Sequence, residues 1–180
     1  MHQELQTENL FESFTDVWKR VTTEPRQFFE EMPVSGGLQN PLVFLLICLT
    51  IGAGGFLIFG PRGFALWIIV LGIVRAFVGA LVLMVVARQI FRGTGDYEAT
   101  FRAVAYASAP VVLVWLPLVR PLLGLYVLFL AILGLERVQN FDAVKAVLTI
   151  LLSVAVIGTV VWTLGLGHLW MPPLTLPHCA

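Results

Sequence analysis

The stretch FALWIIVLGIVRAFVGALVLMVVARQ, residues 64 to 89, decides the fold class, because it is apolar except for Arg75 and its last two residues. A helix needs roughly 20 such residues to cross the hydrocarbon core of a bilayer. The whole 180-residue chain has this character, since 58% of it is hydrophobic and only 12% is charged. A soluble domain carries about twice that charged share. The sequence therefore predicts an all-α, polytopic membrane helix bundle.

The chain contains five apolar stretches that could form transmembrane helices. They comprise residues 41–59, 64–89, 100–118, 121–137 and 143–166. Because the polar turns between them are short, consecutive helices must run antiparallel. We predict a five-helix transmembrane domain over residues 41–167. A cytoplasmic amphipathic segment (1–40) precedes it, and a short extracytoplasmic tail (168–180) follows.

Basic residues are distributed unevenly between the two sides of this predicted bundle. Eight lie on the side of the N-terminal segment and two on the opposite side, and the basic side of a membrane protein usually faces the cytoplasm. We therefore expect a cytoplasmic N-terminus and a C-terminus outside. The eight are Lys19, Arg20, Arg26, Arg88, Arg92, Arg102, Arg137 and Lys145, and the two are Arg62 and Arg120.

The N-terminal segment has the pattern of two amphipathic helices. Phe11, Phe14 and Trp18 recur on one face of the first, and Phe28 and Phe29 follow a proline that can begin the second. Aromatic faces with nearby basic residues are typical of helices that lie in the membrane interface. We predict interfacial helices here, with docking of a cytosolic partner as the alternative.

Three groups of residues form motifs that follow the order of the predicted spans. The first group is Trp18, Pro25, Phe28, Phe29, Gly36, Gly37 and Pro41. The second lies in GTGDYEATFRAVAYASAP and comprises Gly95, Thr100, Phe101, Tyr106, Ser108 and Pro110. The third lies in GLERVQNFDAVKAV and includes Lys145 and Ala146. Together, over roughly residues 18–160, they resemble the Yip-domain family, the Ypt/Rab-interacting membrane proteins.

This resemblance implies five membrane-spanning helices and a cytosolic N-terminus. In eukaryotic members it implies a role in vesicle traffic with Rab-type GTPases. The chain lacks the D-L-Y-G-P stretch of those members and is similar to the compact prokaryotic branch. For that branch we expect an integral protein of the inner (cytoplasmic) membrane, with no small GTPase as partner.

Arg75 is the charge that most needs an explanation, because an arginine at the centre of a span costs at least about 2.5 kcal/mol. Small residues surround it at helical spacings and predict a face for close helix packing. These residues are Gly72, Ala76, Gly79 and Ala80. Glu136 in the fourth span is the candidate partner. Their pair is predicted either to lock the helix register or to line an ion, proton or anion path.

No catalytic constellation, metal pattern or cofactor motif is found in the sequence, and its zero net charge does not favour nucleic acid. We therefore predict a non-enzymatic membrane scaffold or accessory subunit. Its expected partners are membrane lipids and other integral membrane proteins or further copies of itself. The alternatives are an oligomeric channel or transporter that uses Arg75 and Glu136, and a vesicle-traffic adaptor for a small GTPase.

Overall fold

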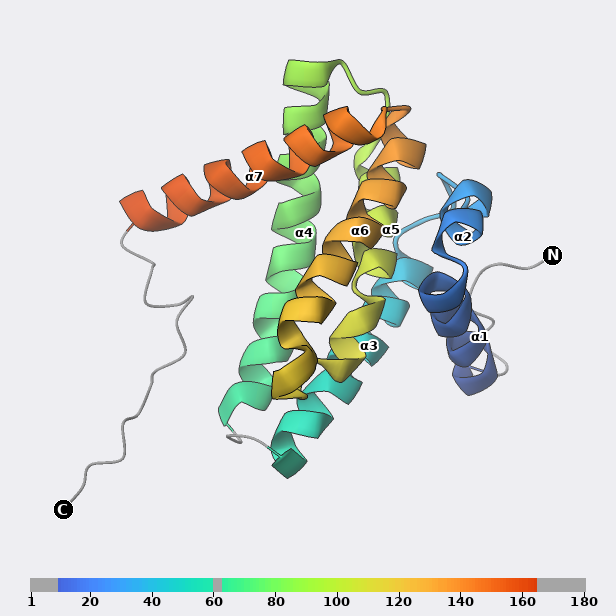
Figure 1. Ribbon diagram of the computed structural model, residues 1–180, viewed down its shortest axis with the longest axis vertical. Coiled ribbons are helices and arrows are strands. Elements are labelled where there is room, and N and C mark those ends of the chain that lie inside the picture. Colours follow the sequence, from blue (N-terminus) through green and yellow to red (C-terminus); the bar gives the residue numbers. More distant parts are fainter. Residues whose placement is uncertain (1–9, 60–62, 165–180) are drawn as a thin grey trace.

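The computed structural model describes residues 10–59 and 63–164, and this part of the chain is built from helices (Figure 1). The α-helices are α1 (Leu10–Thr23), α2 (Pro25–Glu31), α3 (Gln39–Phe59), α4 (Gly63–Phe91), α5 (Tyr97–Ala107), α6 (Arg120–Gln139) and α7 (Ala143–Thr163). Two 3-10 segments, η2 (Ala109–Leu113) and η3 (Pro117–Val119), connect α5 to α6. The predicted all-α class is confirmed.

Four of the described helices are long and apolar enough to cross a membrane. They are α3, α4, α6 and α7, and their candidate spans are Gln39–Ile58, Ala65–Phe91, Pro117–Gln139 and Ala143–Thr163. These helices overlap four of the five predicted spans. Their apolar side chains remain widely exposed on the outside of the bundle, as expected for surfaces that contact lipid.

The third predicted span, residues 100–118, is not a continuous helix. The α-helical part ends at Ala107, and the chain continues as the 3-10 segments η2 and η3. Pro110 explains the break, because it has no N–H to donate to the carbonyl of Tyr106 and its ring crowds that carbonyl. The third predicted span is therefore found in parts, as the α-helix α5 followed by 3-10 segments.

Helix α5 lies inside the bundle, surrounded by α3, α4 and α6 (Figure 1). Eight of its eleven residues are buried. Alanines on α5 permit close packing, and Gly134 of α6 approaches Ala103 so closely that a Cβ atom there would lie 2.8 Å from the alanine methyl. Short side chains, rather than a long apolar stripe, thus allow this helix to form the centre of the molecule.

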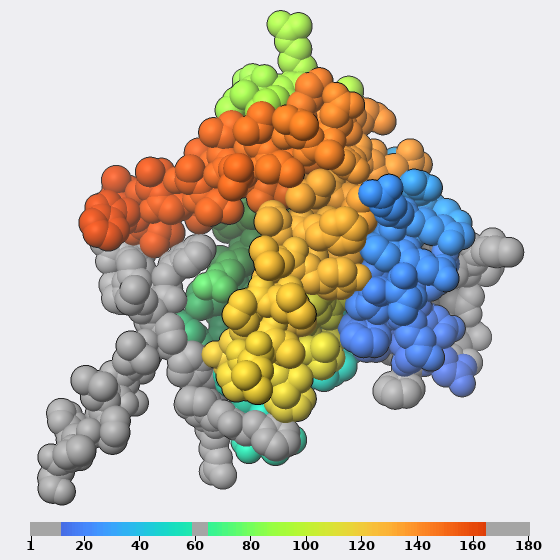
Figure 2. All heavy atoms as spheres, viewed as in Figure 1, coloured from blue at the N-terminus to red at the C-terminus, as the bar shows by residue number. Residues whose placement is uncertain are grey.

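Helix α7 is held to the bundle through its first half only. Ala146, Ile150 and the α6 residue Leu135 form a small core cluster there. Beyond Ser153 the side chains of α7 are exposed or half-buried around the whole helix. The space-filling view shows α7, in orange and red, crossing the bundle and extending beyond it (Figure 2).

The N-terminal helices α1 and α2 pack against the other helices with their apolar faces. Phe14, Phe28 and Phe29 belong to the largest core cluster, together with Phe44 of α3 and Tyr106 of α5. The prediction that this face lies in the membrane interface is therefore corrected, since protein covers it. The periodicity identified an apolar face but did not identify what covers it. The side chain of Phe11 is outside the described part of the structure.

Candidate functional site

The family-motif loop between α4 and α5 is joined to the end of α6 by one glutamine. Gln139 accepts a hydrogen bond from the backbone N–H of Gly95 at 2.9 Å and donates one to the hydroxyl of Thr100 at 3.1 Å. Both side chains are buried, with exposures of 1% for Gln139 and 0% for Thr100. Buried polar groups that are satisfied by one another fix a single geometry. We name this set of three residues the junction.

Gly95 leaves room for this arrangement because it has no side chain. A Cβ atom there would lie 2.7 Å from the carbonyl oxygen of Val138. On its other side, Arg88 donates from Nε to the carbonyl of Gly95 at 3.1 Å and forms an ion pair of 2.6 Å with Asp96. Asp96 occupies the N-cap position of α5, but its carboxylate makes no bond to the helix backbone.

The aromatic residues of the motif point to opposite sides of α5. Phe101 packs against Phe77 of α4, with ring centroids 4.6 Å apart. Tyr106 packs between Phe28 and Phe44, with both centroid distances 5.1 Å. The motif residues thus bind α5 to α4 on one side and to the N-terminal helices on the other.

Pro110 belongs to the same contact region, because the carbonyl of the preceding residue, Ala109, accepts a hydrogen bond from α1. The indole N–H of Trp18 donates to the carbonyl oxygen of Ala109 at 3.0 Å. Further along α1, the carbonyl of Thr22 accepts a hydrogen bond of 2.7 Å from the hydroxyl of Tyr126 on α6. Trp18 therefore contacts η2, and its predicted interfacial position is replaced by a position against protein.

A fully buried arginine, Arg102, lies at the centre of this region. Its guanidinium donates to the carbonyl oxygen of Gly37 at 2.9 Å and lies 4.0 Å from the carboxylate of Glu98. The same carboxylate accepts the backbone N–H of Gly37 at 2.6 Å. Gly37 has a φ of +87°, which favours glycine. The pair of charges therefore holds the turn that leads into α3 against α5.

The sequence places Arg102 among the basic residues of the predicted cytoplasmic side but does not reveal that it is buried. The available signal was Glu98 one helical turn earlier, because opposite charges at this spacing share a helix face. The predicted cost of a buried arginine was assigned to Arg75 instead. That prediction depends on how deep the residue lies along a span, and depth does not reveal which face of the helix is covered by protein.

Replacing Arg102 by lysine is expected to destabilise the protein by about 1–3 kcal/mol, because an ammonium group cannot reproduce the fork of the guanidinium donors. The measurement is the denaturant dependence of unfolding in detergent micelles. Arg137→Lys is the matched control, since Arg137 is exposed at the end of α6. Equal stability of the two variants would contradict a structural role for the Arg102 contacts.

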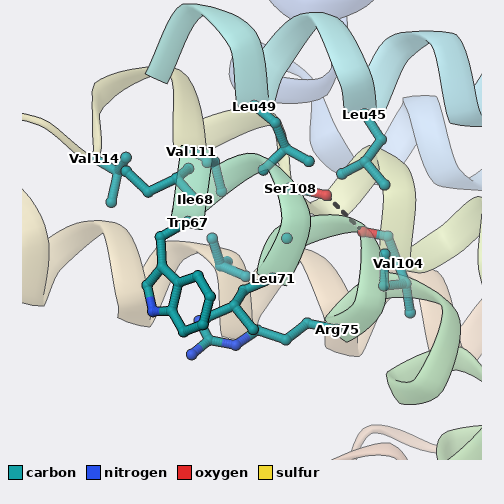
Figure 3. Close-up of a pocket in the computed structure, with 13 residues that line it drawn as sticks. Leu45, Leu49, Trp67, Ile68, Leu71, Arg75, Val104, Ser108, Val111 and Val114 are labelled. Carbon is teal, nitrogen blue, oxygen red and sulfur yellow. Dashed lines mark hydrogen bonds between the residues drawn. The ribbon is translucent and has the colours of Figure 1, made fainter. Parts of the chain in front are cut away.

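Arg75 lines a cavity of about 520 Å³ formed by α3, α4, α5, η2 and one residue of α6. The residue is exposed at the surface of α4. In Figure 3 its side chain extends along the helix toward Trp67, on the same side as Leu71. Arg75 is therefore not enclosed within the bundle, as a buried pair with Glu136 would require.

Glu136, the proposed partner of Arg75, lines a different cavity. This second cavity, of about 420 Å³, lies between α2 and the end of α6. Its other charged lining residues are Arg26, Glu30 and Arg137. The structure thus places the two members of the predicted pair beside different elements of the bundle.

The small residues around Arg75 divide into two groups. Ala76 and Ala80 are buried, and Gly72 faces Leu49 of α3, where a Cβ atom would collide with the leucine side chain. Gly79 has no neighbour within 4 Å of an added Cβ atom and faces outward. Three of the four residues therefore lie at the contact between α4 and the rest of the bundle.

Among the described residues, no group of three or more His, Cys, Asp or Glu side chains is arranged to hold a metal ion. The predicted tail, residues 168–180, lies outside the described residues. Four apolar helices, three of which pack around a buried α5, define an integral membrane protein with an all-helical domain.

The sequence also matches one protein-family model. The Yip1 domain matches residues 19–165, which is most of the chain. The protein therefore belongs to the Yip1 domain family, and the resemblance seen in the sequence motifs is confirmed. No curated protein and no solved structure matches the chain.

Proposed function

We propose that this protein is a non-enzymatic membrane scaffold or accessory subunit that assembles with copies of itself or with other membrane proteins. The observation that carries the proposal is the second half of α7. This segment has apolar side chains on all sides and no core contacts with its own bundle beyond Ser153. A helix of another protein packed along it would cover this surface and fix its direction.

We further propose five membrane crossings, in which α5 and η2 together form the third. An odd number of crossings puts the two ends of the chain on opposite sides, and we propose a cytoplasmic N-terminus and an outer C-terminus in a prokaryotic inner membrane. The α4–α5 loop and the end of α6 meet at the junction, where Arg88 and Arg137 lie nearby, while Arg120 is at the opposite end of α6. This distribution supports a cytoplasmic junction under the positive-inside rule.

The alternative of an oligomeric channel or transporter receives less support from the geometry. A conducting path needs polar groups that follow one another along a single route. Arg75 and Glu136 instead line two cavities beside different helices. Assembly through α7 requires neither residue.

The proposal predicts that Val156→Trp weakens the assembly by about tenfold or more, because overpacking a close helix contact costs roughly 1–3 kcal/mol. Tryptophan is compatible with lipid contact, so a helix that faces only lipid would tolerate it. The measurement is the mass of the intact complex, with its companions, after extraction in nanodiscs. Val156 is 44% exposed, and Val78 on α4, at 46%, provides the matched control as Val78→Trp.

A monomeric wild type without companions would contradict the proposal. The same holds if both tryptophan variants change the assembly equally, because the effect would then be unrelated to α7. A stable complex with a different membrane protein would identify the protein as an accessory subunit, and a complex of identical copies would identify it as a self-assembling scaffold.

A further inference from the structure

The cavity beside Arg75 has a wall of apolar side chains and one charged group. Leu45 and Leu49 of α3, Ile68 and Leu71 of α4, and Val111 of η2 form much of the wall (Figure 3). Its volume of about 520 Å³ falls within the roughly 300–1,000 Å³ of small-molecule sites. The cavity thus offers space for a hydrocarbon chain rather than for a polar solute.

The charges around this cavity have one sign. Arg75 is the charged residue in the lining, and no acidic residue is part of that lining in the described structure. A second cation, Arg120, donates from Nε to the carbonyl oxygen of the lining residue Val114 at 2.9 Å. Its guanidinium also lies over the ring of Phe56, 5.1 Å from the ring centroid. Both cations favour an anionic group at this end of the bundle.

The cavity borders the part of the bundle that is most open to lipid. Only 11% of the α4 span is buried within the structure, compared with 44% of the α3 span. The α4 residues Leu66, Val70 and Val74 are exposed next to the cavity. A lipid molecule can therefore approach α4 from the bilayer without entering the protein from an aqueous phase.

Arg75 lies deep along α4, so a lipid phosphate that binds it must be drawn inward from the membrane interface. The residue lies about 18 Å from the first residue of α4, at a rise of about 1.5 Å per residue. Its side chain extends toward Trp67, and so toward the beginning of α4 (Figure 3). Arginine reaches toward an interface in this way, and its fork can bind phosphate oxygens in pairs. Val114, whose carbonyl accepts the hydrogen bond from Arg120, lines the same cavity.

We propose that this cavity binds one membrane lipid with an anionic phosphate headgroup. Arg75 contacts the phosphate, and an acyl chain lies against the apolar wall between α3, α4 and η2. The charge complementarity and the open lipid-facing side favour this occupant over a second protein. The site is independent of α7, so it does not rest on the assembly proposed above.

Native mass spectrometry of the full-length protein tests the proposal. The protein is placed in nanodiscs that contain equal amounts of phosphatidylglycerol and phosphatidylcholine, and the lipids retained after release are counted by mass. The wild type is expected to retain one phosphatidylglycerol in preference to phosphatidylcholine, on the order of tenfold, as for a charge-assisted contact. Equal retention of the two lipids by the wild type would overturn the proposal.

Four variants separate the effects of charge, cavity space and nonspecific attraction. Arg75→Leu is expected to lose the preference, and Arg75→Lys is expected to keep most of it, because the charge remains. Val114→Trp is expected to lower retention of both lipids by filling the cavity. Arg137→Leu, which removes an exposed cation beside the other cavity, is the matched control and is expected to behave as the wild type.

The wild-type comparison keeps the test valid even if a variant does not fold, and the unfolding midpoint of each variant identifies that case. Two further results would overturn the proposal. One is an unchanged phosphatidylglycerol count in folded Arg75→Leu, and the other is equal loss in Arg137→Leu. A cross-linker placed at position 71, in the cavity wall, would also overturn the proposal if it captured another membrane protein instead of a lipid.

Discussion

Replacing Gly95 by valine is expected to disrupt the junction and destabilise the protein by about 3 kcal/mol or more. An added Cβ atom would lie 2.7 Å from the carbonyl oxygen of Val138 and 2.8 Å from Nε2 of Gln139. Overpacking costs about 1–3 kcal/mol, and displacing Gln139 leaves buried polar groups without partners at a similar cost. Denaturant-induced unfolding in micelles and the yield of monodisperse protein measure the effect.

Gly124→Val is the matched control for this prediction. Gly124 is exposed on α6, and an added Cβ atom there meets nothing within 4 Å. Valine is also a better helix former than glycine, so the control is expected to be neutral or slightly stabilising. If Gly95→Val unfolded at the same denaturant concentration as Gly124→Val, the close approach at Gly95 would not contribute to stability.

The second large effect is expected from Phe29→Ala, which removes the aromatic side chain that holds α2 to the bundle. Phe29 is 1% exposed, packs edge-on against Phe28 with a centroid distance of 5.5 Å, and borders Gly134 of α6. Truncation of a buried phenylalanine costs about 3–5 kcal/mol. Because the buried apolar residues of α1 and α2 belong to one core cluster, we expect both helices to detach before the transmembrane helices unfold.

Limited trypsin digestion measures this detachment, since α1 and α2 contain Lys19, Arg20 and Arg26. Cleavage there should be much faster in Phe29→Ala than in the wild type. Phe129→Ala is the control, because Phe129 is 39% exposed on α6 and should cost less than about 1 kcal/mol. Slow cleavage in Phe29→Ala would show that the N-terminal helices are held by other contacts.

The long helices of the bundle could be predicted from the sequence because their signal is composition over a sufficient length. The predicted spans 41–59, 64–89, 121–137 and 143–166 correspond to α3, α4, α6 and α7 within a few residues. The bilayer requires internally bonded backbone over about 20 residues, so apolar runs of that length have few other structures available. Pro25 was likewise predicted to begin a short helix, and α2 begins there.

The interior of the bundle could not be predicted in the same way. Arg75 and Arg102 are both arginines near apolar residues, yet Arg75 is exposed on α4 and Arg102 is fully buried on α5. The difference depends on Glu98, one helical turn before Arg102, and on the Gly37 turn, which approaches Arg102 only in three dimensions. Hydropathy measures the cost of burying a charged side chain. It contains no information on groups distant in sequence, such as the Gly37 carbonyl, that stabilise this charge.

The burial of α5 also has a consequence for biosynthesis. Its polar residues Thr100 and Arg102 are satisfied by Gly37, made earlier, and by Gln139, made some forty residues later. If α5 entered the bilayer when it left the ribosome, the Thr100 hydroxyl would keep its bond to the carbonyl of Asp96, but the buried backbone N–H of Gly95 would lack the Gln139 oxygen. The helix at the centre of the molecule must therefore reach its final position only after α6 has been synthesised, which makes the middle of the chain one of the last parts to become ordered.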